Sequence, residues 1–225
     1  MSRITEINES LNYTNWSSFR LVNRGGDSAS LQKSFDSFLD DLKTLDVTLR
    51  GAYDLRGFRG DSDLLIWLHG PQAENIQLAL RGFLSSEFGS RFQGFWSGMG
   101  MHRPAEFNRS HVPGYLMGKP AQKWLSIYPF VRSFEWYLLD EADRREMLIE
   151  HGVAGQKYPG IVSNTVASFA LGDYEWLLAL EGAELAELVD MMRDLRYTKA
   201  RLHVREETPF FTGQMLDLTQ IGETF

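Results

Sequence analysis

The residues with the clearest chemical potential lie in the segment KWLSIYPFVRSFEWYLL, residues 123–139. If this segment is an extended strand, its side chains alternate between two faces, and Tyr128, Arg132 and Trp136 share one of them. An arginine offers a planar fork for a carboxylate, and a phenol or an indole can be oxidised. This face could therefore bind a carboxylate beside oxidisable rings. The alternative is a core strand whose Arg and Tyr reach its edge.

One histidine has a helical setting that suits a metal-bound cofactor. The chain has five histidines, and none of them pairs at the HExxH or HxH spacing of a zinc site, so a metal centre built from side chains alone is not expected. His151 shares a helix face with Met147 and Leu148, where an imidazole can point into a cavity as the axial ligand of a large planar iron cofactor. The alternative is a histidine that stabilises the C-terminal end of a helix dipole.

Further polar residues could complete such a site. His111 lies in a long connection, HRPAEFNRSHVPGYLMGKPAQ, where it could accept a proton beside a bound ligand or simply be a solvated loop residue. Lys199, Arg201 and Arg205 lie near the last expected strand and could meet the anionic arms of a substrate, or be ordinary surface charges. The chain contains no GxGxxG, P-loop or GxSxG motif, so nucleotide and hydrolase functions have no motif in their favour.

Composition narrows the class of protein. The 225 residues include 30 acidic and 23 basic side chains, and the net charge of -7 disfavours a general nucleic-acid binder. The absence of cysteine excludes disulfides, thiolate metal sites and a cysteine nucleophile. The start, MSRITEINES, lacks the pattern of a signal peptide, and no stretch approaches the ~20 apolar residues of a membrane span. We therefore expect a soluble cytoplasmic protein with no membrane and no nucleic-acid partner.

Several residues recur at an offset of 112 positions, and this internal echo indicates that the chain contains two copies of one structural unit. Five residues around GDSDLLIWLHG recur around GDYEWLLALEG, namely Gly60, Asp61, Leu65, Leu68 and Gly70 as Gly172, Asp173, Leu177, Leu180 and Gly182. Arg20 and Arg132 are related by the same offset. Since a few identities can arise by chance, the order of elements must carry the argument.

Hydrophobic periodicity predicts the same order, βαββαβ, in each half. The first half has expected strands at 13–22, 47–53, 64–69 and 92–97, with helices from about 28 to 45 and from about 76 to 84. The second half has a long strand or strand pair at 123–139, a helix capped by Asp140 that ends at His151 and Gly152, strands at 162–170 and 174–181, a helix around 185–195 and a last strand at 200–206. Such units form ferredoxin-like sheets with helices on one face.

We therefore predict an α+β fold of two ferredoxin-like domains, residues 1–110 and 111–225, packed as a dimeric α/β barrel. If one helix is displaced from its sheet, a pocket can open between them. The irregular joint, residues 102–122, is long enough that a functional role is expected.

Three stretches of the second half, YPFVRSFEWYLL, EMLIEHG and SNTVASFALGDYEWLLALE, resemble the actinobacterial branch of the coproheme decarboxylases, within the chlorite dismutase-like superfamily. The resemblance covers nearly the whole chain, from NYTNWSSFRL to REETPFFTG. It implies a cyclic homopentamer with an iron porphyrin in the C-terminal domain. It also implies that hydrogen peroxide converts two propionates of iron coproporphyrin III (coproheme) to vinyl groups, through a three-propionate intermediate. The product is haem b, coproheme is both substrate and redox cofactor, and coproporphyrin ferrochelatase is an expected transient partner.

The same resemblance assigns roles to individual residues. It implies that His151 is the neutral proximal iron ligand, that Tyr128 is the catalytic tyrosine and that His111 is the distal histidine. Substrate contacts would come from Arg132, from Trp136 as an oxidisable neighbour of the porphyrin, and from Arg201. Glu175 and Glu181 are candidates for a partner of the His151 ring, which the decarboxylase branch does not require.

Two competing functions remain open. In chlorite dismutases a distal arginine retains reactive oxygen species, whereas this chain has Ser163, Asn164 and Thr165 in the corresponding stretch, which argues against chlorite chemistry. A haem-dependent peroxidase or a chlorite-degrading relative is nevertheless the alternative enzyme. The third function is a haem-binding protein without catalysis, in which Tyr128 and Arg132 would be incidental neighbours.

Overall fold

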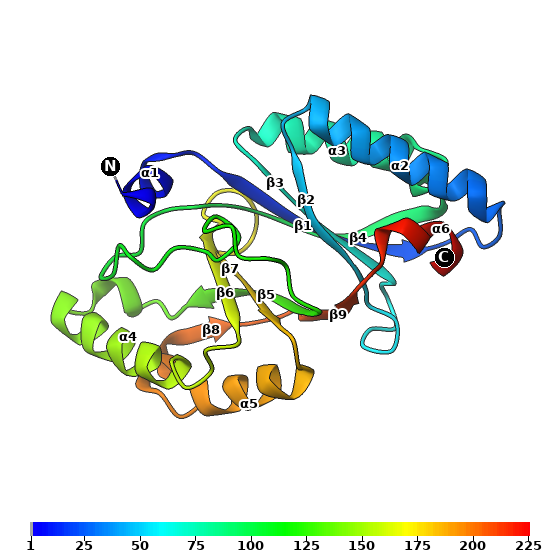
Figure 1. Ribbon diagram of the computed structural model, residues 1–225. Coiled ribbons are helices and arrows are strands. Elements are labelled where there is room, and N and C mark those ends of the chain that lie inside the picture. The colour runs from blue at the N-terminus through cyan, green and yellow to red at the C-terminus, as the bar shows by residue number, and fades with distance from the viewer. Residues whose placement is uncertain (1) are drawn as a thin grey trace. The chain divides into compact units, whose positions relative to one another are not determined.

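The computed structural model describes residues 2–225, which form two compact units (Figure 1). The N-terminal unit comprises residues 9–102 and 211–225, and the C-terminal unit comprises residues 2–8 and 103–210. This division differs from the expected one at 110/111, because the last 15 residues belong to the N-terminal unit. Among the described residues, no helix has the length and apolar composition needed to cross a bilayer.

The N-terminal unit has the expected βαββαβ order. Its sheet is antiparallel, with the strand order β4-β1-β3-β2, and Figure 1 shows both long helices on the same face. The helices bury a cluster rich in phenylalanine, including Phe35, Phe38 and Phe83, against that face. The elements are β1 (Tyr13–Leu21), α2 (Ser28–Thr44), β2 (Thr48–Asp54), β3 (Leu64–Gly70), α3 (Ala73–Ser85) and β4 (Phe92–Met101).

The tail joins this unit through specific contacts. Strand β9 (Phe211–Met215) pairs with β2, and helix α6 (Ile221–Thr224) packs on α2. The side chain of Gln32 donates to the carbonyl of Leu218 at 2.8 Å and accepts from the backbone N–H of Gly222 at 3.1 Å. The ring of Phe225 completes the aromatic cluster by contacting Phe92 at a centroid distance of 5.4 Å.

The C-terminal unit repeats the topology with the strand order β8-β5-β7-β6. Each strand occupies the place of its counterpart in the first unit, since the first strand of each motif lies between the fourth and the third. This equivalence confirms two ferredoxin-like βαββαβ units in an α+β fold. The elements are β5 (Trp124–Arg132), α4 (Glu141–Gly155), β6 (Val162–Ala167), β7 (Trp176–Gly182), α5 (Leu185–Leu195) and β8 (Val204–Glu206), with α1 (Arg3–Glu9) at the start of the chain.

The internal echo corresponds to equivalent places in the two units. Leu65 and Leu68 lie buried on β3, while Leu177 and Leu180 lie buried on β7, the third strand of each motif. Gly70 and Gly182 end these two strands.

Three boundaries in the C-terminal unit differ from the sequence prediction. Strand β5 ends at Arg132, and residues 136–138 form a 3-10 helix rather than more strand. Helix α4 continues to Gly155, so His151 and Gly152 lie inside it, and no left-handed glycine ends it there. The last strand is short, because residues 199–203 form a second 3-10 helix before β8.

Helix α4 packs differently from the other long helices. Only Met147 of α4 is buried, while Ile149 and Val153 are 60% and 57% exposed. Its main contacts are with α5 and with the 3-10 helix at 199–203, whereas α5 packs on β7. Such a displaced helix is the arrangement for which the sequence predicts a pocket between helix and sheet.

Candidate active site

Tyr128 lies on β5 in an almost completely buried position, with 4% of the residue exposed. Its ring stacks on Phe210 at a centroid distance of 4.3 Å, and its hydroxyl donates to the sulfur of Met192 on α5 at 3.5 Å. Burial raises the pKa of Tyr128 well above its usual value, and the negative charge of Glu207 raises it further. The phenol is therefore held in its protonated form.

Arg132 and Trp136 meet, although not by the alternation that the sequence predicts. Because β5 ends at Arg132, Phe134 turns outward with 74% exposure, while the following 3-10 helix brings Trp136 back to a buried position. The Arg132 guanidinium lies over the Trp136 ring, 4.2 Å from its centroid, and its backbone N–H donates to Glu175. Burial lowers the pKa of Arg132, and the nearby Glu175 and Tyr137 oppose that shift.

His151 has a neutral hydrogen-bond partner, Thr198. The Nδ1 atom of His151 lies 3.3 Å from Oγ1 of Thr198, and that hydroxyl donates its single proton to the carbonyl of Leu195 at 2.9 Å. Since the hydroxyl has no second proton, Nδ1–H must be the donor to Thr198. This assignment leaves Nε2 unprotonated, with a lone pair available to a metal.

The electrostatics of His151 place it near several other predicted site residues. Burial lowers its pKa, and the positive charges of Arg132 and Arg196 lower it further. The charge of His111 contributes in the same direction, so the two histidines lie within electrostatic range of each other. His111 itself is exposed in the irregular joint, residues 102–122, where partial desolvation lowers its pKa.

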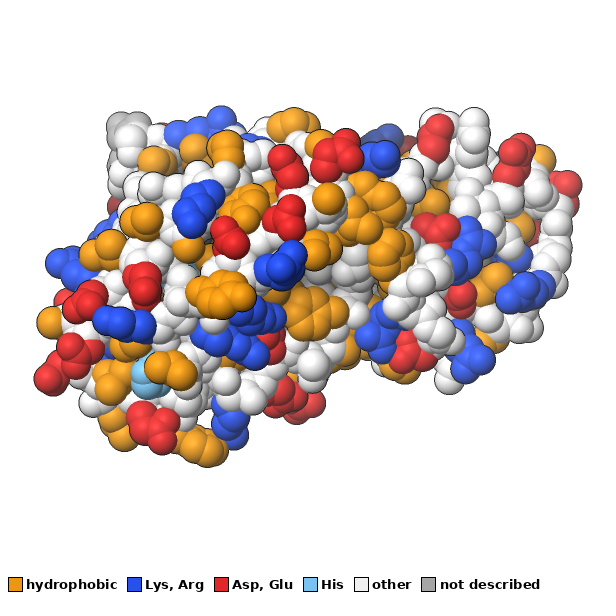
Figure 2. Space-filling view, turned by 90° about the horizontal axis from the view of Figure 1, so that it is seen from below, with side chains coloured by type: hydrophobic (Ala, Val, Ile, Leu, Met, Phe, Trp, Pro, Cys, Tyr) orange, Lys and Arg blue, Asp and Glu red, His pale blue; other side chains and the backbone are white. Residues whose placement is uncertain are grey.

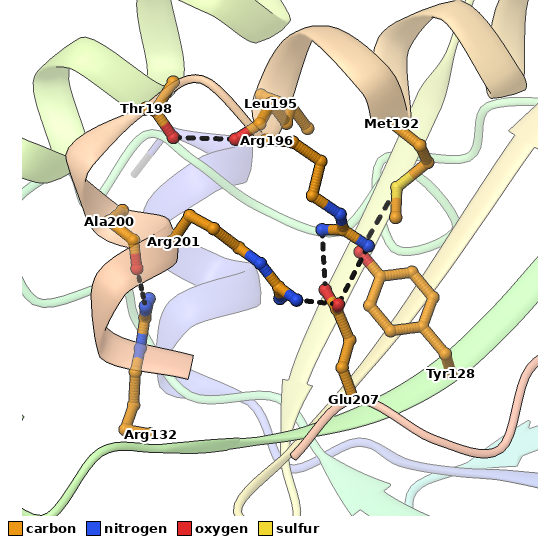
Figure 3. A network of polar contacts seen from close by, with 9 residues as sticks. All are labelled: Tyr128, Arg132, Met192, Leu195, Arg196, Thr198, Ala200, Arg201 and Glu207. Atoms are coloured by element: carbon orange, nitrogen blue, oxygen red, sulfur yellow. Dashed lines mark hydrogen bonds and ion pairs between the residues drawn. The ribbon is translucent and has the colours of Figure 1, made fainter. Parts of the chain in front are cut away.

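Arg201 takes part in a three-residue ion-pair network beside Tyr128 (Figure 3). Both carboxylate oxygens of Glu207 accept from Arg196, at 3.0 and 2.8 Å, and one of them also accepts from Arg201 at 2.7 Å. Arg201, Glu207 and Phe210 also line a shallow depression of about 310 Å³. A carboxylate is thus already bound by two arginines next to the candidate catalytic phenol.

Lys199 and Arg205, the other two basic residues that we expected near the last strand, lie outside the network of Arg196, Arg201 and Glu207. Lys199 pairs with Glu146 at 3.3 Å on the surface, and the guanidinium of Arg205 lies over the exposed ring of Phe134. Figure 2 shows acidic, basic and apolar side chains intermingled on the face that it presents. Attraction of an anionic substrate on that face would therefore depend on particular arginines rather than on a broad positive field.

Neither candidate carboxylate is the observed partner of His151. Glu175 accepts from the backbone N–H of Arg132 at 2.8 Å and from the hydroxyl of Tyr137 at 2.9 Å. Glu181 is fully buried and accepts from the side chain of Asn164 at 3.1 Å. Asn164, which belongs to the stretch Ser163–Thr165, is thereby fixed within the sheet.

The sequence prediction missed four residues of this site: Arg196, Thr198, Glu207 and Phe210. Arg196 and Thr198 follow α5, and Glu207 and Phe210 follow β8, so each lies just outside a periodic element. A run of charges, REE at 205–207, was the only signal, and such runs usually mark a solvated surface.

Comparisons with known proteins agree with the fold. The sequence model of the chlorite dismutase family matches residues 28–216. The coproheme decarboxylase of Mycolicibacterium smegmatis is 44% identical over 218 residues, which cover 96% of this chain and 94% of that protein. Two structures of the chlorite dismutase from Candidatus Nitrospira defluvii, a variant and an imidazole complex, each share 19% identity with a TM-score of 0.82. They cover 96% and 95% of this chain, and 95% and 94% of theirs, and at this identity they support the fold alone. The chain belongs to the chlorite dismutase family.

Proposed function

We propose that the protein is a coproheme decarboxylase, which uses hydrogen peroxide to convert iron coproporphyrin III to haem b through a three-propionate intermediate. The 44% identity to a coproheme decarboxylase over almost the whole chain supports this function. The structural observation that carries it is the buried, protonated phenol of Tyr128, next to arginines that bind a carboxylate. In each step one propionate and one peroxide molecule give one vinyl group, one carbon dioxide and two waters.

The residues present fit an iron porphyrin. Among residues 2–225, no group of three or more His, Cys, Asp or Glu side chains is placed to hold a metal ion. A single imidazole with a free Nε2, as in His151, suits a metal whose other ligands come from a macrocycle. Helix α4, which carries His151, buries Met147 in a small cluster with Trp136 and leaves Ile149 and Val153 exposed.

In this proposal the iron of bound coproheme supplies the oxidising equivalents through its reaction with hydrogen peroxide. Tyr128 gives up an electron together with its phenolic proton, and then takes a hydrogen atom from the β-carbon of a propionate, which restores the phenol. The propionate radical loses a second electron to the remaining oxidising equivalent of the peroxide, carbon dioxide leaves and the vinyl group forms. A high pKa suits this role, because the phenol must keep its proton until it is oxidised. Trp136 is the second oxidisable ring of the site.

The polar residues position the reacting groups. Arg132 holds the reacting propionate near the Tyr128 oxygen, where a displacement of about 1 Å would cost on the order of a hundredfold in rate. Arg201 contacts a further propionate. His111 accepts a proton from hydrogen peroxide and returns it to the departing oxygen, and its lowered pKa keeps it neutral and able to do so at pH 7. His151 binds iron through Nε2, and with a hydroxyl rather than a carboxylate as its partner it donates little extra charge.

The Tyr128→Phe variant tests the proposal. Since the change removes one oxygen and keeps the ring that stacks on Phe210, we expect the variant to bind coproheme. Mass spectrometry of the porphyrin after peroxide addition should then find no vinyl product, while the wild-type protein loses one carboxyl group and then a second. Normal product formation by the variant would remove Tyr128 from this role. Oxygen release from chlorite by the wild-type protein, without vinyl formation, would favour the chlorite-degrading alternative.

The remaining parts of the proposal concern assembly and location. A cyclic homopentamer in the cytoplasm, with transient contact to coproporphyrin ferrochelatase, is what the family resemblance implies for an enzyme that acts after iron insertion. Light scattering would test the assembly, since a pentamer has five times the chain mass of 25.8 kDa.

A further inference from the structure

The segment that follows β8 covers the candidate catalytic phenol. We call residues 207–210 the cap segment. At one end Glu207 is fixed by Arg196 and Arg201, and at the other end Phe210 stacks on the Tyr128 ring at 4.3 Å. The cap segment and α5 together leave Tyr128 only 4% exposed. A substrate carbon can reach the phenol only if part of this cover moves.

The ion pairs that fix the cap segment are of a kind that a substrate can replace. Arg196 binds Glu207 with both arms of its fork, the geometry that arginine prefers for any carboxylate. The side chains of Arg196 and Arg201 are 37% and 38% exposed, so an incoming anion can reach them. Glu207 itself is only 14% exposed, and both arginines pair with it.

The surroundings have room for one carboxylate arm. The depression of about 310 Å³ at this point is lined by Arg201, Glu207 and Phe210. That volume is at the lower end of ligand pockets, which range from ~300 to 1,000 Å³. Arg205 and Glu206 also line the depression and offset each other in charge. Arg196 and Arg201 against Glu207 leave a net positive charge, which attracts an incoming carboxylate that then competes with Glu207 for the two arginines.

We propose that Glu207 is an internal competitor for a carboxylate of the substrate. Glu207 holds the cap segment over Tyr128, and a propionate that takes Arg196 and Arg201 displaces Glu207 and uncovers the phenol. The inference rests on the proposed function, because it takes the competing carboxylate to be a porphyrin propionate. It assigns roles to Arg196 and Glu207, and it makes access to Tyr128 depend on the carboxylates of the ligand.

The Glu207→Gln variant, with Glu206→Gln as its matched control, tests the inference. Both changes remove one negative charge from the lining of the same depression. They differ because Glu206 is exposed and pairs through its backbone with β5, whereas Glu207 is the carboxylate that Arg196 and Arg201 hold. In the protein without porphyrin, Glu207→Gln should increase hydrogen exchange of backbone amides in residues 206–211, and Glu206→Gln should not. Ferric coproheme should bind Glu207→Gln roughly tenfold more tightly than it binds the control. A tenfold change in affinity corresponds to about the free energy of one charge-assisted hydrogen bond.

A ligand without carboxylates separates competition from a general opening of the site. The tetramethyl ester of ferric coproporphyrin III should gain less than twofold in affinity from Glu207→Gln. Arg196→Gln should increase exchange in the cap segment as Glu207→Gln does, but it should weaken coproheme binding, because it removes a partner of the propionate as well as of Glu207.

Three results would overturn the inference. They are equal coproheme affinity in Glu207→Gln and the control, weaker binding by Glu207→Gln, or an equal gain for the ester. These outcomes are distinct from failure of the proposed function, which would appear in the wild-type protein as no vinyl product from bound coproheme.

Discussion

At the scale of single residues, the position of one proton decides which ring nitrogen of His151 is available to a metal. The Thr198 hydroxyl donates to the Leu195 carbonyl and can therefore only accept from Nδ1–H, which directs the free lone pair of the ring to Nε2. The Leu195 carbonyl thus favours the tautomer of His151 that has its proton on Nδ1, because it accepts the only proton of the intervening Thr198 hydroxyl. A carboxylate in the same position would add negative charge, whereas a hydroxyl sets the tautomer and adds none.

The Thr198→Val variant should remove this preference while nearly conserving the shape of the side chain. We expect nitrogen NMR of His151 in the protein without porphyrin to change from mainly one tautomer to a mixture of the two. Ferrous coproheme bound to the variant should show a shifted iron–histidine stretching frequency. Thr198→Ser keeps the hydroxyl and is the control. An unchanged nitrogen spectrum in Thr198→Val would mean that another group fixes the ring.

A second residue-scale prediction concerns His69 on β3, in the N-terminal unit. Burial lowers the pKa of His69 to about 4, and the charge of Arg50 acts in the same direction. The unfolded chain, with a pKa near 6.5, therefore binds more protons than the folded protein between about pH 4 and 6.5, so stability falls as the pH falls through this window. At pH 5 His69 should cost about 2 kcal/mol of the unfolding free energy.

Urea unfolding of wild-type protein and His69→Asn at pH 7 and pH 5 measures this contribution. The difference between the two proteins should shrink or reverse at pH 5, because only the wild type carries the titrating ring. A pH-independent difference would contradict the lowered pKa.

At the scale of elements, the two long helices of the C-terminal unit, α4 and α5, pack differently. Helix α5 buries Leu188, Met191 and Leu195 against its sheet, whereas α4 buries only Met147. The first arrangement is that of a core helix, whereas the proposed function makes the second helix one wall of the porphyrin site. Loss of apolar contacts should therefore have very different effects on stability in the two helices.

The pair Leu188→Ala and Ile149→Ala tests this contrast within one unit. Leu188 is 3% exposed and Ile149 is 60% exposed. We expect Leu188→Ala to lower the unfolding free energy by about 2–5 kcal/mol, and Ile149→Ala to change it by no more than about 0.5 kcal/mol, in urea titrations without porphyrin. Similar losses in both variants would mean that α4 contributes to the core as α5 does.

The sequence is informative about elements wherever a period of 3.6 or 2 extends over many residues. The helix around Leu31 and Phe35 and the strand around Leu65 follow from this periodicity. Periodicity fails where an irregular turn places a side chain. The aromatic run after Ser133 has the composition of a strand, but there the chain forms a 3-10 helix, which buries Trp136 against Arg132. Likewise, a glycine such as Gly152 is typical of a helix end, although α4 continues beyond it to Gly155.

The candidate site could be predicted only in part. Tyr128, Arg132 and His151 have residue types that suggest chemistry by themselves. The contact between Glu207 and Arg196 joins residues 11 positions apart across a 3-10 helix and a short strand, and no regular spacing relates them. Thr198 is a common residue whose importance depends on where its one proton goes.

At the scale of the whole molecule, residues 211–225 return to the N-terminal unit after the chain has passed through the C-terminal unit. Residues 211–225 add β9 to the sheet beside β2 and place α6 against α2. The expected boundary at 110/111 misses this return, because the tail has no long periodic element. The tail is thus part of the N-terminal core, although it follows the C-terminal unit in the sequence.

Removal of residues 211–225 should therefore destabilise the N-terminal unit, to which they belong, rather than the C-terminal unit, which precedes them directly in the sequence. Hydrogen exchange of a chain that ends at residue 210 should rise in α2, which loses the contacts of Gln32 and of α6, while α5 should keep its protection. The Gln32→Ala variant of the full chain should give a weaker form of the same pattern. Greater exchange in α5 than in α2 would mean that the tail supports the C-terminal unit instead.

Because residues 211–225 complete the N-terminal unit, they also constrain the order in which the two units can fold during synthesis. A ribosome releases the chain from its N-terminus, and domains usually fold in that order. Here β9 and α6 follow residues 103–210 in the chain, so the sheet of the N-terminal unit cannot be completed until after the whole of the C-terminal unit has been synthesised. The unit that is synthesised first therefore cannot be complete before the sequence of the unit that bears Tyr128 and His151.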